Sequence, residues 1–116
     1  MLSFENVAKL LPHAQQLVNR KYETHILAGV NSTLNILCKF ERQIMDTKHR
    51  KLSDPDYRNN RELQEQMRKC QACVEKFRDF VNSKGFKKAL LRDGEVNSTS
   101  RKLEAQIESL LSDFDR

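Results

Sequence analysis

Apolar residues recur every three or four positions along most of the chain, which is the spacing of one face of an α-helix. In the N-terminal segment this face consists of Val7, Leu10, Leu11, Ala14, Leu17, Val18, Tyr22 and Ile26. The pattern predicts a helix over residues 3–28, and Gly29 is expected to stop it. Pro12 lacks a backbone donor and crowds the preceding turn. We therefore expect a kink at Pro12, or a short helix that ends near Leu11 and a new helix that begins at Pro12.

A second helix is predicted over residues 32–48. Its apolar arc is wide, because Ile36 and Phe40 lie off the main stripe, and such an arc indicates contacts on two sides of the helix. The main stripe consists of Leu34, Leu37, Cys38 and Ile44. Residues 48–56 are expected to form a loop, in which Asp54 can cap the next helix and Pro55 can occupy its first turn.

The third predicted helix, over residues 56–83 with Asn60 as the alternative start, has the most regular pattern. Steps of four and three residues alternate between its apolar positions, as in a coiled-coil seam. These positions are Leu63, Met67, Cys70, Val74, Phe77 and Val81. Gly85 is expected to end this helix. A short helix over residues 86–91, a polar linker over 92–99 and a last helix over 100–114 follow.

No stretch alternates apolar and polar residues long enough to predict a β-strand. We therefore expect an all-α protein, a helical bundle or array of about five helices, forming one domain over residues 1–116. With 38% hydrophobic and 32% charged residues, the chain can form one modest core. No apolar run is long enough to span a bilayer, and the first residues lack the layout of a signal peptide. We expect a cytoplasmic protein that does not contact membranes.

The Cys70-x-x-Cys73 pair is the strongest candidate for metal or redox chemistry. Structural zinc requires four ligands, usually in two close pairs. The other Cys and His residues, Cys38, His13, His25 and His49, form no second pair. The pair therefore fits two small buried side chains better than a metal site. No Gly-rich phosphate loop and no catalytic spacing around the histidines is present, so we expect no catalytic residue, cofactor or metal, and no enzyme activity.

Basic residues form several clusters that together give the chain a net charge of +5. The clusters are Arg20-Lys21, Lys48 to Lys51, Lys84 with Lys87, Lys88 and Arg92, and Arg101-Lys102. Such clusters usually cover a solvated face, but clusters near the ends of helices can merge into one positive surface. Acidic protein segments, microtubules and nucleic acid are the partner classes that such a surface attracts. Nucleic acid ranks low, because no base-reading helix or aromatic stacking platform accompanies the charge.

Three short segments are similar to one known family. They are Leu10-Leu11-Pro12, Asn19-Arg20-Lys21-Tyr22-Glu23, and Lys69-Cys70-Gln71-Ala72-Cys73. Over residues 7–111 the chain resembles the C-terminal conserved domain of the katanin regulatory subunit, the WD-repeat subunit that lacks the ATPase, and its shorter B-like relatives. Such subunits usually carry a WD-repeat propeller ahead of this domain, whereas this sequence has no Trp and no blade-length repeat. We expect either an excised domain or a short relative without a propeller.

The resemblance implies a non-enzymatic interaction module. It implies that the domain heterodimerises with the N-terminal helical domain of the katanin catalytic AAA ATPase subunit and targets or regulates microtubule severing. It also implies binding to microtubule-associated and spindle-pole recruiting proteins, and a place in the cytoplasm on the microtubule cytoskeleton and at spindle poles or centrosomes. The alternative from charge alone is a stand-alone basic helical domain that binds microtubules or nucleic acid electrostatically.

Seven residues are predicted to bind partners. The apolar arcs of the first two helices exceed what a small core requires, which indicates either a broader core or a helix-binding face. In the best-matching segment, an aromatic ring with a polar tip follows two cations, a composition typical of the centre of an interface. The competing interpretation makes this aromatic the last core residue of its helix. The predicted set is Arg20, Lys21, Tyr22, His25, Ile26, Ile36 and Phe40.

Overall fold

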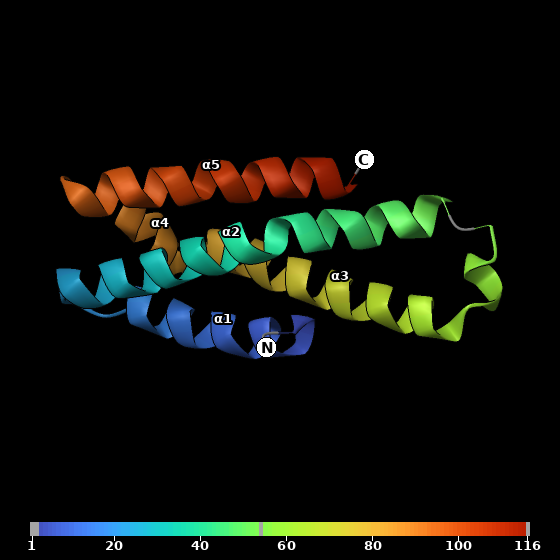
Figure 1. Ribbon diagram of the computed structural model, residues 1–116. Coiled ribbons are helices and arrows are strands. Elements are labelled where there is room, and N and C mark those ends of the chain that lie inside the picture. Colours follow the sequence, from blue (N-terminus) through green and yellow to red (C-terminus); the bar gives the residue numbers. More distant parts are fainter. Residues whose placement is uncertain (1–2, 54, 116) are drawn as a thin grey trace.

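The protein is all-α in a computed structural model that describes residues 3–53 and 55–115 (Figure 1). Its helices are α1 (Phe4–Val18), α2 (Glu23–Ser53), α3 (Arg61–Asn82), α4 (Lys84–Leu90) and α5 (Glu95–Asp115), with a 3-10 turn, η1, at Tyr57–Asn59. The described residues contain no strand, so the predicted fold class is confirmed. None of the described helices combines the length and apolar character that a bilayer crossing requires.

The helices form an elongated bundle of about 50 × 23 × 21 Å. Helices α2 and α3 make a long antiparallel hairpin, and α1 packs against both of them (Figure 1). Helix α5 runs along the other side of α2, and the short α4 joins α3 to α5. The end of the hairpin near η1 extends beyond the start of α1 and the end of α5.

The first two predicted helices have the wrong boundaries. Helix α1 ends at Val18, the chain turns over residues 19–22, and α2 runs from Glu23 through Gly29 to Ser53. A Cβ atom on Gly29 would lie 2.6 Å from the Ala14 carbonyl oxygen. This glycine therefore permits a close crossing of α1 and α2 and does not stop a helix. The predicted 32–48 helix is the middle of α2, and Pro12 lies inside α1.

The predicted loop over residues 48–56 is shorter than expected, because α2 continues to Ser53. Asp54, expected to cap the next helix, lies outside the described residues. Pro55 belongs to a turn before η1. The cap of α3 is Asn60, whose side-chain oxygen accepts a hydrogen bond from the Leu63 backbone N–H at 3.0 Å. Helix α3 thus begins directly after the later of the two predicted starts, Asn60, and not at Pro55.

Towards the C-terminus the chain is more helical than predicted. Gly85 lies inside α4, where it is buried, and it does not end the third helix. Residues 95–99 of the predicted 92–99 linker belong to the first turn and a half of α5, because α5 begins at Glu95. The turn before it depends on Gly94, whose φ of 77° favours glycine. The Asn97 side chain donates to the Leu90 carbonyl at 2.6 Å and links α5 to the end of α4.

One apolar cluster draws on all five α-helices of the described chain. Its largest fully buried side chains are Phe77, Phe80 and Phe86, and the predicted seam residues Cys70 and Val74 are also fully buried. At the C-terminal end of α5, the buried Lys48 ammonium donates to the Asp113 carbonyl at 2.6 Å. It also lies 5.7 Å from the centre of the Phe114 ring. A cation placed at the last carbonyls of a helix is favourable, and it connects α5 to α2.

Candidate partner-binding surface

Four of the predicted partner-binding residues lie together at the turn between α1 and α2. Arg20, Lys21 and Tyr22 are exposed, and Tyr22 keeps 69% of its surface accessible. The Tyr22 carbonyl accepts the backbone N–H groups of His25 and Ile26 at 3.0 and 3.1 Å, which begins α2. The Tyr22 ring packs edge to face against the His25 ring, with 5.5 Å between the two ring centres. Tyr22 is therefore a surface residue, and the interpretation as the last core residue of its helix is wrong.

His25 has an unusual environment at this turn. Its side chain is half-buried, and its Nδ1 atom is buried without a hydrogen-bond partner among the described residues. An unsatisfied buried polar atom costs about 1–3 kcal/mol. The Tyr22 ring covers this side chain, so His25 belongs to the same surface patch as Tyr22.

The remaining three predicted residues do not join this patch. Ile26 and Phe40 are 2% and 4% exposed and belong to the core, and the Phe40 ring packs at 6.2 Å from Phe4. Ile36 is half-buried against the same core. The expected helix-binding face is therefore wrong for Ile26 and Phe40. Helix α2 has apolar positions on several sides because α1, α3 and α5 of the same chain surround it.

A basic hollow of about 370 Å³ opens beside the turn. It is lined by Val18, Asn19, Arg20, Ile26, Lys84, Gly85, Lys88 and Arg92. Four of these described lining residues are cations and none is acidic. Helix α4 approaches the turn closely because Gly85 has no side chain, since a Cβ atom there would lie 1.8 Å from the Asn19 side-chain oxygen.

The cluster of Lys84, Lys87, Lys88 and Arg92 was recognisable in the sequence, but its position beside the α1–α2 turn was not. Lys84, Lys88 and Arg92 are spaced four residues apart, which puts them on one side of a helix and its following turn. This four-residue spacing is the sequence signal that indicates that the three cations lie together. Their approach to Arg20 depends on how α4 packs against α1, which no local pattern contains.

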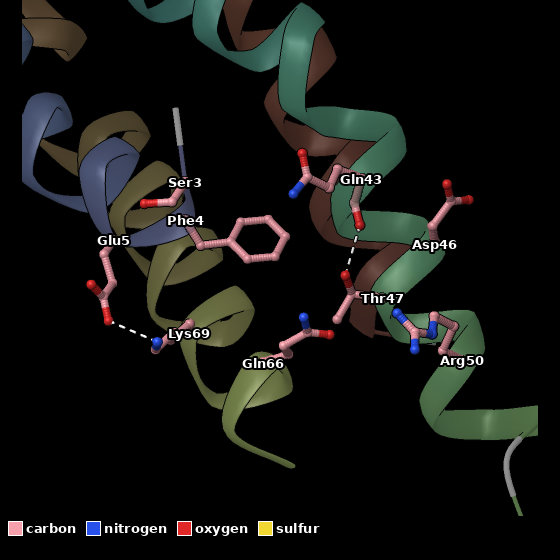
Figure 2. A pocket seen from close by; sticks show the side chains of 9 residues that line it. All are labelled: Ser3, Phe4, Glu5, Gln43, Asp46, Thr47, Arg50, Gln66 and Lys69. Carbon is pink, nitrogen blue, oxygen red and sulfur yellow. Dashed lines mark hydrogen bonds and ion pairs between the residues drawn. The ribbon is translucent and has the colours of Figure 1, made fainter. Parts of the chain in front are cut away.

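A second and larger hollow, of about 470 Å³, lies between the start of α1, the second half of α2 and the first half of α3. Figure 2 shows the Phe4 ring directed into this cleft from α1, facing polar side chains from α2 and α3. The lining residues are Ser3, Phe4, Glu5, Gln43, Asp46, Thr47, Arg50, Gln66 and Lys69. This cleft is therefore a mixed polar and apolar surface formed by three helices.

The cleft does not contain a general acid and base in the usual arrangement. Glu5 pairs with Lys69 at 3.0 Å. The hydrogen bond from Lys69, followed by its charge, lowers the pKa of the Glu5 carboxyl below its ordinary value. Glu5 is therefore an ionised surface carboxylate near neutral pH, and no His or Cys is among the described residues that line the cleft.

The two cysteines of the Cys70-x-x-Cys73 pair are fully buried free thiols. Burial raises the pKa of each thiol to about 12, so neither forms a reactive thiolate near neutral pH. Cys70 also points its thiol at the Ile44 carbonyl, at 3.8 Å. Among the described residues, no three His, Cys, Asp or Glu side chains gather as metal ligands. In this structure the pair fills the core.

A family model described as the con80 domain of katanin matches residues 1–107 of the chain. The comparison with curated proteins gave no match, and neither did the comparison with solved structures. The matched region includes α1 to α4, the turn between α1 and α2, and most of α5.

Proposed function

Because the chain belongs to the katanin con80 family, we propose that it is a regulatory, non-catalytic module that pairs with the N-terminal helical domain of the katanin ATPase and directs microtubule severing. The observation that carries this proposal is the family match over residues 1–107. A regulatory role in katanin and an association with the cytoskeleton follow from the family. The heterodimer, its recruiting proteins and its place at spindle poles are the proposed details.

Two features of the fold support a role in protein binding. The hairpin of α2 and α3 extends beyond α1 and α5, so both helices have faces at that end that these neighbours leave uncovered (Figure 1). The cleft at the start of α1 opens there, and amide and charged side chains from three helices line it around the buried Phe4 ring (Figure 2). Helices commonly dock into such mixed grooves. The cleft is the site that we propose for the ATPase domain, and the turn at Tyr22 is the site for recruiting proteins.

Pairing with the ATPase domain is expected to stabilise the chain. A partner that binds only the folded state at one hundred times its dissociation constant adds about 2.7 kcal/mol, which corresponds to roughly 10 °C in the melting temperature of a domain of this size. The measurement is a thermal melt of the purified chain with and without the N-terminal domain of the ATPase. An unchanged melt contradicts heterodimer formation. Binding of the chain alone to microtubules or nucleic acid that weakens steeply with added salt favours the stand-alone electrostatic domain instead.

Tyr22→Ala is expected to weaken the capture of a recruiting protein by about 2 kcal/mol, because exposed aromatic rings beside cations concentrate binding energy. The melting temperature should stay nearly unchanged, because Tyr22 is 69% exposed. Titration calorimetry with a spindle-pole protein that the wild-type chain captures measures the loss. The matched control is Leu52→Ala, which removes a side chain that is 70% exposed at the C-terminal end of α2, whereas Tyr22 precedes the start of that helix. Normal binding by the Tyr22 variant means that the recruiting site lies elsewhere.

A further inference from the structure

We propose that the basic hollow beside the α1–α2 turn binds a phosphorylated side chain of a partner protein. The hollow places Lys84, Lys88 and Arg92 on one wall and Arg20 on the other. Its volume of about 370 Å³ accommodates one such group together with part of the chain that carries it. This proposal rests on the proposed function in one respect: the phosphorylated side chain is expected to come from a recruiting protein.

The geometry of α4 brings the cations together. Four residues of an α-helix span about 6 Å, so Lys84 and Lys88 lie one above the other along α4. Arg92 continues this row, because its backbone N–H still bonds to the Ala89 carbonyl at 3.2 Å after the helix ends. Arg20 approaches from the turn, to which α4 is held by the close contact at Gly85. Side chains from two separate segments therefore surround one space.

The four cations of the hollow share one space without an acidic partner from the described chain. Among the described residues, ion pairs are formed by three basic side chains: Arg68 with Glu65, Lys69 with Glu5, and Arg78 with Glu75 and Asp115. None of the four basic residues of the hollow forms an ion pair within the described chain. Like charges that lie close together repel one another, and a bound anion removes this repulsion. The hollow of the free protein therefore favours the binding of an anion.

The concentration of charge favours a phosphate over a carboxylate. A phosphorylated side chain carries a charge of about −1.5 to −2 and three strong acceptor oxygens, and clusters of Arg and Lys recognise it through charge-assisted hydrogen bonds. A glutamate brings a single charge to a space lined by four cations. A glutamate-rich segment or a nucleic acid backbone carries its charges in a row, and a row of charges fits a long basic track better than a single compact hollow.

Two exposed apolar side chains that are close in sequence to lining residues of the hollow favour a protein segment over free phosphate. Only four large apolar side chains are strongly exposed among the described residues: Leu10, Tyr22, Leu52 and Leu91. Two of them adjoin the hollow in sequence, since Tyr22 follows Arg20 by two positions and Leu91, 86% exposed, precedes Arg92. Exposed apolar groups beside an anion site provide contacts for the residues that flank a phosphorylated position.

The test uses short fluorescent peptides that carry one phosphoserine between uncharged residues with apolar members. Their binding to the purified full chain is measured by anisotropy beside the same peptides with serine and with glutamate at that position. We expect the phosphoserine peptides to bind at least about tenfold more tightly than either comparison peptide. Inorganic phosphate should compete only at far higher concentration, because it lacks the flanking contacts.

The variant Arg20→Gln with Lys88→Gln is expected to lose this preference. All the changed side chains are exposed, so the melting temperature should be unaffected. The matched control is Lys39→Gln with Arg42→Gln, which removes the same charges from exposed positions of α2 outside the hollow and should bind like the wild-type chain. Amide chemical shifts of the wild-type chain give an independent measurement, with the phosphoserine peptide perturbing Asn19, Gly85 and Arg92 first.

Several results overturn the proposal. Equal binding of the glutamate and phosphoserine peptides assigns the hollow to acidic segments in general. An equal loss of phosphopeptide affinity in both double variants means that the net charge of the protein, and not the hollow, accounts for binding. Binding of vesicles that contain anionic lipid, without binding of the peptides, identifies a membrane surface as the ligand. Because these measurements involve neither the ATPase nor microtubules, their failure leaves the proposed regulatory function untouched, and a failed heterodimer test leaves this site untouched.

Discussion

Phe86→Ala is expected to lower the free energy of unfolding by about 4 kcal/mol, the largest effect among the substitutions considered. Phe86 is fully buried, and its ring packs at 5.2 Å from Phe80. Removing the ring deletes apolar contacts and leaves a cavity between α4 and α3. A loss of this size is a large fraction of the stability of a domain of this length.

The same substitution should also disable the basic hollow. Helix α4 has only seven residues, and a helix that short does not persist without packing. Phe86 and Ala89 are its buried side-chain anchors, so losing the larger one releases Lys84 and Lys88 from their positions opposite Arg20. Urea unfolding monitored by circular dichroism measures the stability, and phosphopeptide binding is measured below the transition. A loss under about 1 kcal/mol would show that α4 is not anchored in this way.

Gly29→Ala is expected to destabilise the chain by about 3 kcal/mol, although alanine forms helices better than glycine by about 1 kcal/mol. The added Cβ atom would lie 2.6 Å from the Ala14 carbonyl oxygen and 2.7 Å from the Val18 Cγ2 atom. A backbone oxygen cannot rotate away, so α1 must shift from α2. The cost of this overpacking exceeds the gain in helix propensity, which decides the sign of the effect.

Gly94→Ala provides the comparison for this substitution. No atom lies within 4 Å of a Cβ atom at Gly94, so its cost comes only from a φ of 77° and should be about 1 kcal/mol. Thermal melts of both variants beside the wild type separate crowding from backbone strain. A stabilised Gly29→Ala variant would mean that α1 and α2 do not cross closely, as the interpretation of Gly29 as a helix stop requires.

Periodicity alone was sufficient for part of the fold. In α3, the predicted seam positions Cys70, Val74 and Phe77 are all fully buried, because a regular apolar stripe on a long helix has one energetically favourable orientation. The same stripe indicated that Cys70 and Cys73 are core residues. Leu63 and Met67 continue the seam and are also buried.

Boundaries between helices were harder to predict. The apolar spacing continues from Val18 to Ile26 as if the helix were unbroken, although the chain turns between them. Both segments point their apolar residues into one core, so a short turn barely changes the pattern. Gly29 and Gly85 resembled helix stops, but each is a helical residue at a close contact between segments. Glycine favours both situations, and its neighbours in sequence do not distinguish them.

The sequence by itself determined the helical class, the family and the buried face of α3, because these depend on residue spacing and on short segments that are continuous in the chain. Only the tertiary structure decided that Ile26 and Phe40 are covered while Tyr22 is exposed. Burial depends on how many helices surround a position, and a single helix does not encode that number. The same reason applies to the basic hollow, where Arg20 meets Lys88 across 67 intervening residues only because α4 packs beside the turn.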